Sequence, residues 1–405
     1  MATALKHPGV LSLAAGFVDN ATLPCQFVKE SMERIGNDPS QVRAALQYDT
    51  TSGNGELRSL ISQSSYENWM TELPDPEQII LTAGSNQFLH LLAEAILDPG
   101  DIVLAAAPTY FVFLGTLKGI GARVVGVQAD EEGICIDALR KQLDELKRAG
   151  LASRVKAIYS VTDFDNPAGS TLSTKRREQL VELVATWRKD CGPCYLLSDN
   201  AYQLLRYEGE PLAPILSLDS DCQDFVFEMG TYSKSFSPGI RVGWGVVPKP
   251  FVEPLLDMKS NMDFGSPHFA QVLVKDLLAS GVMSEHLPTI LHAYRSKRDA
   301  MLSALEDYMG DISGVSWRQP QGGLYVWLTL PSDIDASESG ALWKAATEKG
   351  VLYVPGHYCY PEEGVSVARN TIRLSFGVQN EAGIREGVSR LAAAVRESAN
   401  AQCLA

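Results

Sequence analysis

Short apolar runs alternate with longer stretches of helical period between residues 78 and 247. The apolar runs predict β-strands at 79–81, 102–106, 123–127, 156–161, 194–198, 225–228 and 242–247. The stretches between them predict α-helices over 85–97, 137–149 and 173–189, and turn-forming residues such as those at 98–101 (DPGD) separate the elements. Strands that alternate with helices are typical of βαβ units, so the pattern predicts a largely parallel sheet.

Beyond residue 250 the pattern changes to long helical stretches at 269–278 and 285–308. Strand-type runs follow at 323–330, 351–354 and 371–376, and an amphipathic stretch at 381–397 closes the chain. We therefore predict an α/β protein with two domains. The large domain, residues 47–285, has a mostly parallel seven-stranded sheet, and residues 1–46 and 286–405 form a smaller α+β domain.

Composition places the chain among folded globular proteins, since 45% of its 405 residues are hydrophobic and 21% are charged. Acidic residues outnumber basic ones by 49 to 35, and no basic cluster could follow a phosphate backbone, so nucleic acid is not an expected partner. No apolar stretch approaches the ~20 residues of a membrane helix, and residues 10–18 are too short for a secretory signal. We expect a cytoplasmic protein with no membrane partner.

The seven cysteines, an odd number in a large chain, fit free thiols better than a disulfide framework. Cys191 and Cys194 have the spacing of a thiol redox motif, but such a motif should open a helix, and this pair ends a helical stretch. We favour a turn between a helix and a strand. No histidines lie at zinc spacing, so no metal is expected.

The most informative segment, residues 230–244, reads GTYSKSFSPGIRVGW. A single Ser-Lys pair would normally belong to an exposed loop. Here Lys234 follows a strand-type run and is surrounded by small hydroxyl residues. The whole segment suits a lysine that forms a Schiff base, with Thr231, Ser233 and Arg241 as hydrogen-bond donors to a phosphate.

An ordered set of motifs covers nearly the whole chain: 11–16 (LSLAAG), 47–48 (QY) with 53–58 (GNGELR), 81–87 (LTAGSNQ), 108–110 (PTY), 166–169 (NPAG), 198–202 (SDNAY), the lysine segment and 370–373 (NTIR). The sequence thereby resembles the fold type I enzymes that depend on pyridoxal phosphate, the class I/II aminotransferases, and within them the group with aminoadipate and kynurenine aminotransferases. The resemblance implies an aspartate aminotransferase-like fold, pyridoxal 5'-phosphate as cofactor, and a homodimer with shared active sites.

Three residues carry the expected catalysis. The cofactor withdraws electrons best when its ring nitrogen is protonated, which needs a carboxylate beside it, and Asp199 resembles the residue for this role. A buried aspartate could instead cap the following helix. Tyr202 and Asn166 match the donors to the ring hydroxyl, although Asn166 is also a turn residue, and the resemblance implies that Lys234 is the Schiff base lysine and the general base.

The resemblance also assigns the phosphate end and the ring face. Ser85 and Asn86 open a helix after a strand, so backbone N–H groups and the helix dipole can bind an anion, although Ser85 could be a simple N-cap. Tyr48 matches a tyrosine that reaches the phosphate from the neighbouring subunit, but a lone tyrosine is more often in the core or on the surface. Tyr110 matches the aromatic ring that stacks on the pyridine.

The substrate carboxylate has its own set of residues. Arg373 resembles the arginine that binds this carboxylate with two prongs, although it could instead pair with a neighbouring acid. Gly16 matches the position whose backbone amide approaches the same carboxylate, with Asn166 beside it.

The predicted reaction moves an amino group between an L-amino acid and a 2-oxo acid. A lyase, a β- or γ-replacement enzyme and a carbon–carbon bond-forming enzyme use the same cofactor, and a regulatory protein could retain the fold. The chain departs from the usual family pattern at 54–55, 162–165 and 200–201, around the substrate pocket. Only ten residues precede Leu11, which shortens the N-terminal arm. These departures leave the substrate open.

Overall fold

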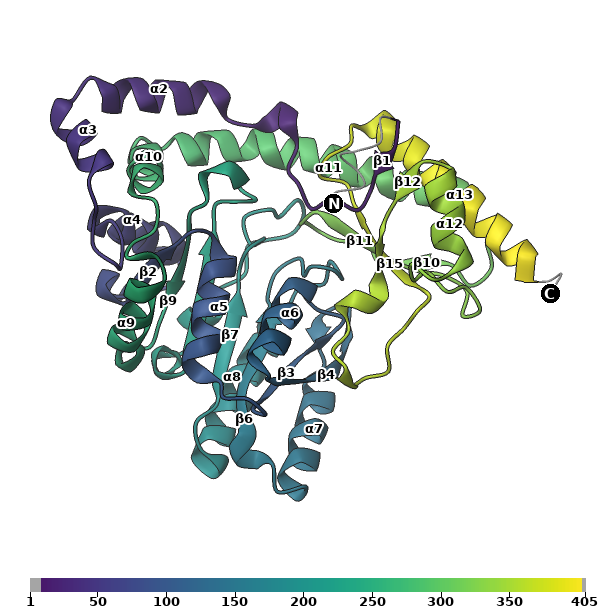
Figure 1. Cartoon of the computed structure of the whole chain (residues 1–405), viewed down its shortest axis with the longest axis horizontal. Helices are drawn as coiled ribbons and strands as arrows, with labels where there is room; N and C mark the ends of the chain where they lie inside the picture. Colours follow the sequence, from purple (N-terminus) through teal and green to yellow (C-terminus); the bar gives the residue numbers. More distant parts are fainter. Residues whose placement is uncertain (1–8, 403–405) are drawn as a thin grey trace.

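The computed structural model describes residues 9–402, and in this part of the chain the central sheet has nine strands in the order β14-β4-β3-β6-β7-β8-β9-β2, with β5 beside β4 (Figure 1). The strands are β2 (Ile79–Thr82), β3 (Ile102–Ala107), β4 (Arg123–Asp130), β5 (Gly133–Ile134), β6 (Val155–Val161), β7 (Tyr195–Asp199), β8 (Val226–Thr231), β9 (Gly243–Val246) and β14 (Glu363–Gly364). Strands β14, β4, β3, β6, β7 and β8 run parallel, whereas β9 is antiparallel to both its neighbours.

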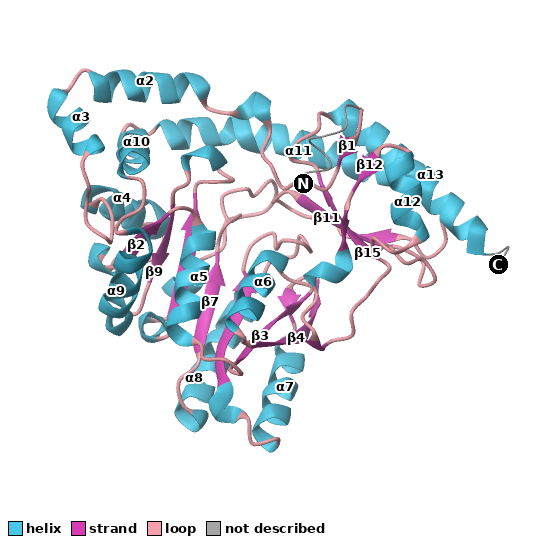
Figure 2. Ribbon diagram, in the orientation of Figure 1, coloured by secondary structure: helices cyan, strands magenta, loops and turns pink. Residues whose placement is uncertain are grey.

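Helices cover both faces of this sheet (Figure 2). One face packs against α5 (Ser85–Ile96), α6 (Phe111–Ile120) and α9 (Val252–Asp263), and the other against α4 (Gly55–Tyr66), α7 (Ile136–Arg148), α8 (Thr174–Cys191) and α10 (His268–Ala279). Strands buried on both faces read as continuous apolar runs, as 102–107 (IVLAAA) does. The N-terminal helices α2 (Cys25–Gly36) and α3 (Pro39–Leu46) extend along the side of α10.

The 28-residue helix α11 (Val282–Met309) leads from the large sheet to a second, smaller layer (Figure 1). There β10 (Ser316–Trp317), β11 (Tyr325–Thr329), β15 (Thr371–Ser375) and β13 (Val354–Pro355) form an antiparallel sheet, and β1 (Leu11–Ser12) pairs in parallel with β12 (Val351–Leu352). Helices α12 (Ala341–Glu348) and α13 (Glu381–Gln402) pack against each other in this layer. The pairing of β1 ties the N-terminal arm to the C-terminal part of the chain.

All seven predicted strands of the large sheet are present, but the predicted number of strands is too small. The short strands β5 and β14 add to the edge of the sheet, and β14 comes from the C-terminal part of the chain. Neither has an apolar run that periodicity could detect. Helices α2, α3, α4, α6, α9 and α12 were also not predicted; α6 (FVFLGTLKGI), for example, is apolar on every side and contains two glycines.

Candidate active site

A cavity of about 240 Å³ opens at the carboxyl ends of the parallel strands, where ligands bind in open α/β sheets. The register of β6, β7 and β8 places Val161, Asp199 and Met229 side by side at this edge. The cavity is lined by Gly16, Phe17, Ser85, Asn86, Tyr110, Val161, Asn166, Asp199, Ala201, Tyr202, Thr231, Ser233, Lys234, Pro238 and Arg241. Eleven of these fifteen residues were singled out from the sequence, and of the predicted site residues only Tyr48 and Arg373 are absent from the lining.

Asp199 is the acidic group of the cavity and is only 3% exposed. The Tyr159 hydroxyl donates to its Oδ2 at 2.9 Å, and the Ala201 N–H donates to its Oδ1 at 3.1 Å. Burial raises the pKa of the Asp199 carboxyl to about 6, although both hydrogen bonds oppose the rise. Two of its roughly four lone-pair positions remain for a ligand, and a cationic ligand would relieve the cost of burying the charge.

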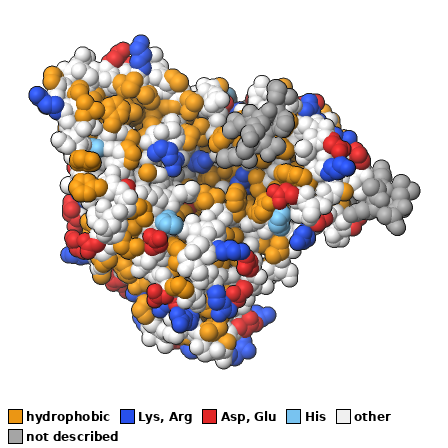
Figure 3. All heavy atoms as spheres, viewed as in Figure 1, with side chains coloured by type: hydrophobic (Ala, Val, Ile, Leu, Met, Phe, Trp, Pro, Cys, Tyr) orange, Lys and Arg blue, Asp and Glu red, His pale blue; other side chains and the backbone are white. Residues whose placement is uncertain are grey.

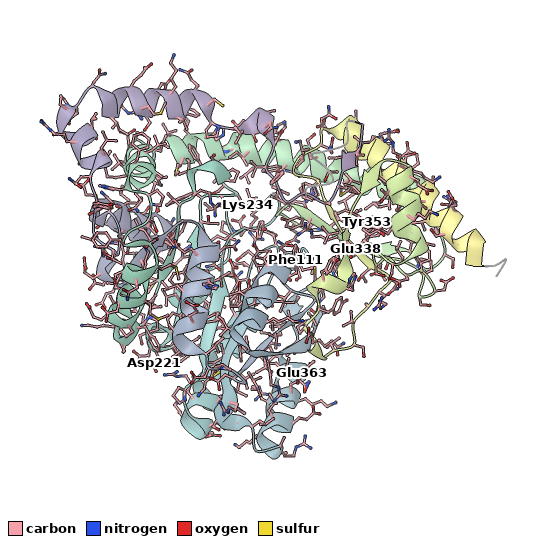
Figure 4. The ribbon with its side chains drawn as sticks, in the orientation of Figure 1. Phe111, Asp221, Lys234, Glu338, Tyr353 and Glu363 are labelled. Carbon is pink, nitrogen blue, oxygen red and sulfur yellow. The ribbon has the colours of Figure 1, made fainter. Side chains whose placement is uncertain are left out.

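Lys234 extends into the cavity from the loop after β8 and is half-buried. Its Nζ donates a hydrogen bond to the backbone oxygen of Gly16 at 2.8 Å. Figure 4 shows Lys234 near the middle of the molecule, and Figure 3 shows a hollow in the same region where Lys and Arg side chains lie among hydrophobic ones. The amine is therefore held inside the cavity by a neutral acceptor.

The start of α5 and the loop before β9 form a cradle of hydrogen-bond donors. Gly84 caps α5 with φ +85°, and a Cβ at this position would lie 2.5 Å from Arg241 Nη2. Arg241 itself has φ +55°, a backbone conformation that residues other than glycine rarely adopt and that clusters at functional sites. Its Nη2 donates to the Ala83 oxygen at 3.0 Å, beside Ser85 and Asn86. The cradle suits an anion, because it combines a helix N-terminus with a guanidinium.

The other residues of this end are arranged around that cradle. The Thr231 hydroxyl donates to Ser233 Oγ at 2.9 Å, and the Ser233 N–H donates to Thr231 Oγ1 at 3.1 Å. The Tyr110 hydroxyl donates to Asn86 Oδ1 at 3.1 Å, and burial raises the pKa of this phenol to about 12. Tyr110 thus stays protonated in the cavity lining, next to Asn86 at the start of α5.

Arg373 lies outside the lining of the cavity but is joined to it through Asn166. The Arg373 Nη1 donates to Asn166 Oδ1 at 2.8 Å, and Nη2 donates to the Ala14 oxygen at 2.7 Å. Arg373 is 4% exposed, and its buried Nε has no hydrogen-bond partner. A buried guanidinium with a donor to spare and no carboxylate partner among the described residues fits an anionic ligand.

Tyr325 belongs to the same group of residues and was missed in the sequence. Its hydroxyl lies 3.3 Å from that of Tyr202, and the Arg373 guanidinium lies 4.3 Å above the centre of its ring. A Cβ at Gly16 would meet the Tyr325 hydroxyl at 2.5 Å, so the glycine leaves room for the phenol. The strand at 323–330 was predicted, but no local pattern shows that it passes beneath Arg373.

Most of the residues that depart from the usual family pattern support the loop that carries Asn166, whereas Asn54 caps α4. Buried Asp163 accepts from Arg177 Nη2 at 2.7 Å and from Arg206 Nη2 at 2.9 Å. Asn200 accepts from the Thr162 hydroxyl. Asn54 caps α4 through a hydrogen bond from the Leu57 N–H at 2.9 Å. These positions hold backbone in place, and only Ala201 of the departing positions lines the cavity.

Tyr48 does not reach the cavity of its own chain. Its side chain is 78% exposed, and its ring makes an edge contact with Phe264 with the centroids 5.4 Å apart. Within one subunit, therefore, the structure gives Tyr48 no contact with the other site residues.

The pair Cys191 and Cys194 lies at the turn that the sequence predicts. Helix α8 ends at Cys191 and β7 begins at Tyr195, which confirms the turn between a helix and a strand. Burial raises the pKa of the Cys194 thiol to about 12, so this thiol is not activated.

Among the residues 9–402, no group of three or more His, Cys, Asp and Glu side chains is arranged to hold a metal ion. No helix in the same range is both long and apolar enough to cross a membrane.

Comparisons with known proteins agree with this geometry. The family model for class I and II aminotransferases matches residues 8–391. The chain is 36% identical over 392 residues to the aromatic-amino-acid aminotransferase 1 of Thermococcus litoralis, with 96% of this chain and 88% of the relative covered. The crystal structure of a kynurenine aminotransferase of Pyrococcus horikoshii with PMP has a TM-score of 0.89 and 34% identity, covering 98% of this chain and 93% of that one. The α-aminoadipate aminotransferase of Thermus thermophilus, complexed with N-(5'-phosphopyridoxyl)-L-leucine, has a TM-score of 0.85 and 31% identity over 99% and 95% of the two chains.

Proposed function

Because the chain belongs to the aminotransferase class I and II family and is a pyridoxal-phosphate-dependent aminotransferase of fold type I, we propose that Lys234 binds the cofactor as a Schiff base while an amino group moves between an L-amino acid and a 2-oxo acid. The observation that carries this proposal is that Lys234, Asp199 and the start of α5 line one cavity. An amine, a buried carboxylate and an anion cradle are the three groups that an aldehyde, a ring nitrogen and a phosphate require.

The residues present fit both ends of the cofactor. The phosphate would be held by five residues that line the cavity: Ser85, Asn86, Thr231, Ser233 and Arg241. Gly84 keeps this cradle open, because a Cβ at its position would collide with Arg241. Asp199 would hold the ring nitrogen, and Tyr110 would pack on the ring. Tyr202 and Asn166 would donate to the ring hydroxyl. When bound, pyridoxal phosphate withdraws electrons from the α-carbon of an amino acid attached to it.

Arg373, Gly16 and Lys234 would bind the substrate and move its proton. Arg373 would bind the α-carboxylate with its free N–H groups, held in orientation by Asn166 and the Ala14 oxygen, and Gly16 would offer its backbone amide. The Lys234 Nζ, once released, lies beside Gly16, where it can take the proton from the substrate α-carbon and return it. The same amine would thus serve as anchor and as general base.

An optical experiment tests the reaction. Purified protein is expected to be yellow, to bleach when an L-amino acid is added, and to recover its colour with a 2-oxo acid. An amino acid amide should bleach it far more weakly at equal concentration, because Arg373 would lose its carboxylate partner. A panel of amino acids, read by absorbance, would rank the substrates. Bleaching that no 2-oxo acid reverses, or release of a side-chain fragment, would contradict aminotransfer.

We also propose a homodimer in which Tyr48 completes the phosphate site of the partner subunit. Tyr48, Leu46, Phe264 and Phe269 are 47–78% exposed, and Figure 3 shows hydrophobic side chains gathered over the region of α2, α3 and α10. Exposed apolar patches of this kind mark interfaces. Sedimentation velocity should show a dimer, and Tyr48→Ala should weaken cofactor binding while the dimer persists. A fully active monomer would rule this arrangement out.

The proposal also covers the division into domains and the location of the protein in the cell. The division into a large domain, 47–285, and a small domain, 1–46 with 286–405, is supported by α11, which leads from the nine-stranded sheet to the four-stranded sheet, although β14 of the second segment pairs with β4 of the large sheet. A cytoplasmic location is supported by six cysteines that are free in the described part of the chain. Limited proteolysis and cell fractionation, respectively, test them.

A further inference from the structure

Tyr325 lies behind the cavity lining, in contact with Arg373 on one side and with the lining residue Tyr202 on the other. It is the first residue of β11, it is 2% exposed, and the register of β11 with β15 sets it two residues from the pair Trp327 and Arg373. Its ring lies beneath the Arg373 guanidinium, and its hydroxyl fills the space that Gly16 leaves open. One side chain therefore touches the arginine of the substrate end and the tyrosine of the cofactor end.

These contacts form a closed circuit of four side chains. Arg373 Nη1 donates to Asn166 Oδ1 at 2.8 Å, and Asn166 Nδ2 donates to the Tyr202 hydroxyl at 3.4 Å. The Tyr202 and Tyr325 hydroxyls are 3.3 Å apart, and the Tyr325 ring returns to Arg373 through the cation–π contact at 4.3 Å. Each member has two neighbours within the circuit, so fixing one restricts the others.

We propose that Tyr325 is a positioning residue for the transamination, whose hydroxyl orients the Tyr202 hydroxyl toward the cofactor and whose ring supports Arg373 against the substrate carboxylate. The proposal rests on the function assigned above. It adds a residue that neither the motifs nor the cavity lining identified.

The hydrogen-bond directions follow from the number of protons available. The Tyr202 hydroxyl has one proton, and it accepts from Asn166 Nδ2. If Tyr202 donates its proton to the cofactor, the bond between the phenols must run from Tyr325 to Tyr202. Accepting a bond from Tyr325 makes the Tyr202 O–H a stronger donor.

The electrostatics of the pair agree with this assignment. Burial and the neighbouring phenol raise the pKa of Tyr202 well above its usual value, so Tyr202 keeps its proton. Burial also acts to raise the pKa of Tyr325, but the Arg373 and Lys234 cations outweigh it and leave that pKa below its usual value. Tyr325 is therefore the better donor of the two phenols.

The test compares single and double variants of the holoenzyme. Tyr325→Phe removes the hydroxyl and keeps the ring, and Tyr202→Phe removes the group through which Tyr325 is proposed to act. Tyr353→Phe is the matched control: its hydroxyl donates to the Ala336 oxygen at 3.0 Å in a buried site of the small layer, away from Lys234 (Figure 4). The measurements are the pH midpoint of the cofactor's visible absorption and the KM for the amino acid.

Tyr325→Phe is expected to raise the absorption midpoint by about 0.2–0.5 pH units, because a weaker Tyr202 donor stabilises the ring oxygen less. Tyr202→Phe should raise it further, and adding Tyr325→Phe to that variant should produce no additional shift. Tyr325→Phe should leave KM within twofold, whereas Tyr325→Leu, which also removes the ring, should raise KM about tenfold. Tyr353→Phe should change neither quantity.

Three outcomes would overturn the inference. One is an unchanged midpoint in Tyr325→Phe. Another is a shift of the same size in the Tyr202→Phe background, since Tyr325 would then act without Tyr202. The third is loss of the cofactor from Tyr325→Phe, because a positioning hydroxyl is not needed for the phosphate contacts. An unchanged midpoint in Tyr202→Phe would instead reject the role of Tyr202 in the proposed function.

Discussion

Replacing Lys234 with alanine is expected to lower turnover at least about 10⁴-fold, the upper range for loss of a general base, since the same change also removes the proposed covalent anchor. The fold should persist, because Lys234 is half-buried and makes a single hydrogen bond, to the Gly16 oxygen at 2.8 Å. Borohydride reduction followed by peptide mass mapping should place the reduced cofactor on Lys234 in the unmodified protein. The measurement is kcat for the amino acid selected by the absorbance panel.

The control for this substitution is Lys249→Ala, which removes an exposed lysine at the far end of β9. It should keep normal turnover and the reduced label on Lys234. Label on a different lysine, or normal rates in Lys234→Ala, would show that another amine does the chemistry. Addition of a small primary amine to Lys234→Ala should restore part of the activity if the missing function is proton transfer.

The seven longer strands of the large sheet and its mostly parallel character could be predicted, because they depend on local sequence patterns. Buried parallel strands such as β3 are continuous apolar runs, and the helices between them keep one apolar stripe. Strand β14 could not be predicted, because Glu363 and Gly364 are polar or small and become a strand only by pairing with Val125 and Gly126. Helix α6 was missed because its apolar residues surround it, so it has no helical period.

The site could be predicted to the extent that its residues lie in recognisable segments. Asp199 is the last residue of β7, and Ser85 and Lys234 each come three residues after the end of a strand, at the edge where the parallel strands end. Tyr325 has no such signal. Its proposed function depends on Gly16 and Tyr202, which are 309 and 123 positions away in the sequence, and only the pairing of β11 with β15 brings it beneath Arg373.

Replacing Asp199 with alanine is expected to slow turnover about 10²- to 10³-fold, because the ring nitrogen would lose the charge that keeps it protonated. Tyr159, which donates to Asp199 Oδ2 at 2.9 Å, would remain as a neutral neighbour that cannot replace this charge. The measurement is the single-turnover rate of bleaching by the amino acid. Asp221→Ala, at an exposed site distant from Lys234 (Figure 4), is the control and should react normally.

The same carboxyl should make the cofactor-free protein less stable at neutral pH. Burial raises the Asp199 pKa to about 6, above its unfolded value near 4, so the folded state binds this proton more tightly. The cost is absent below about pH 4, grows as pH rises toward 6, and reaches up to about 3 kcal/mol at higher pH. Without cofactor at pH 8, Asp199→Asn should therefore have a higher melting temperature than the unmodified protein, and the difference should vanish near pH 4.

Added cofactor should stabilise the unmodified protein more than the variant, because only the carboxylate can pair with a protonated ring nitrogen. Equal melting temperatures of the two cofactor-free proteins at pH 8 would mean that the negative charge of Asp199 does not destabilise the folded protein.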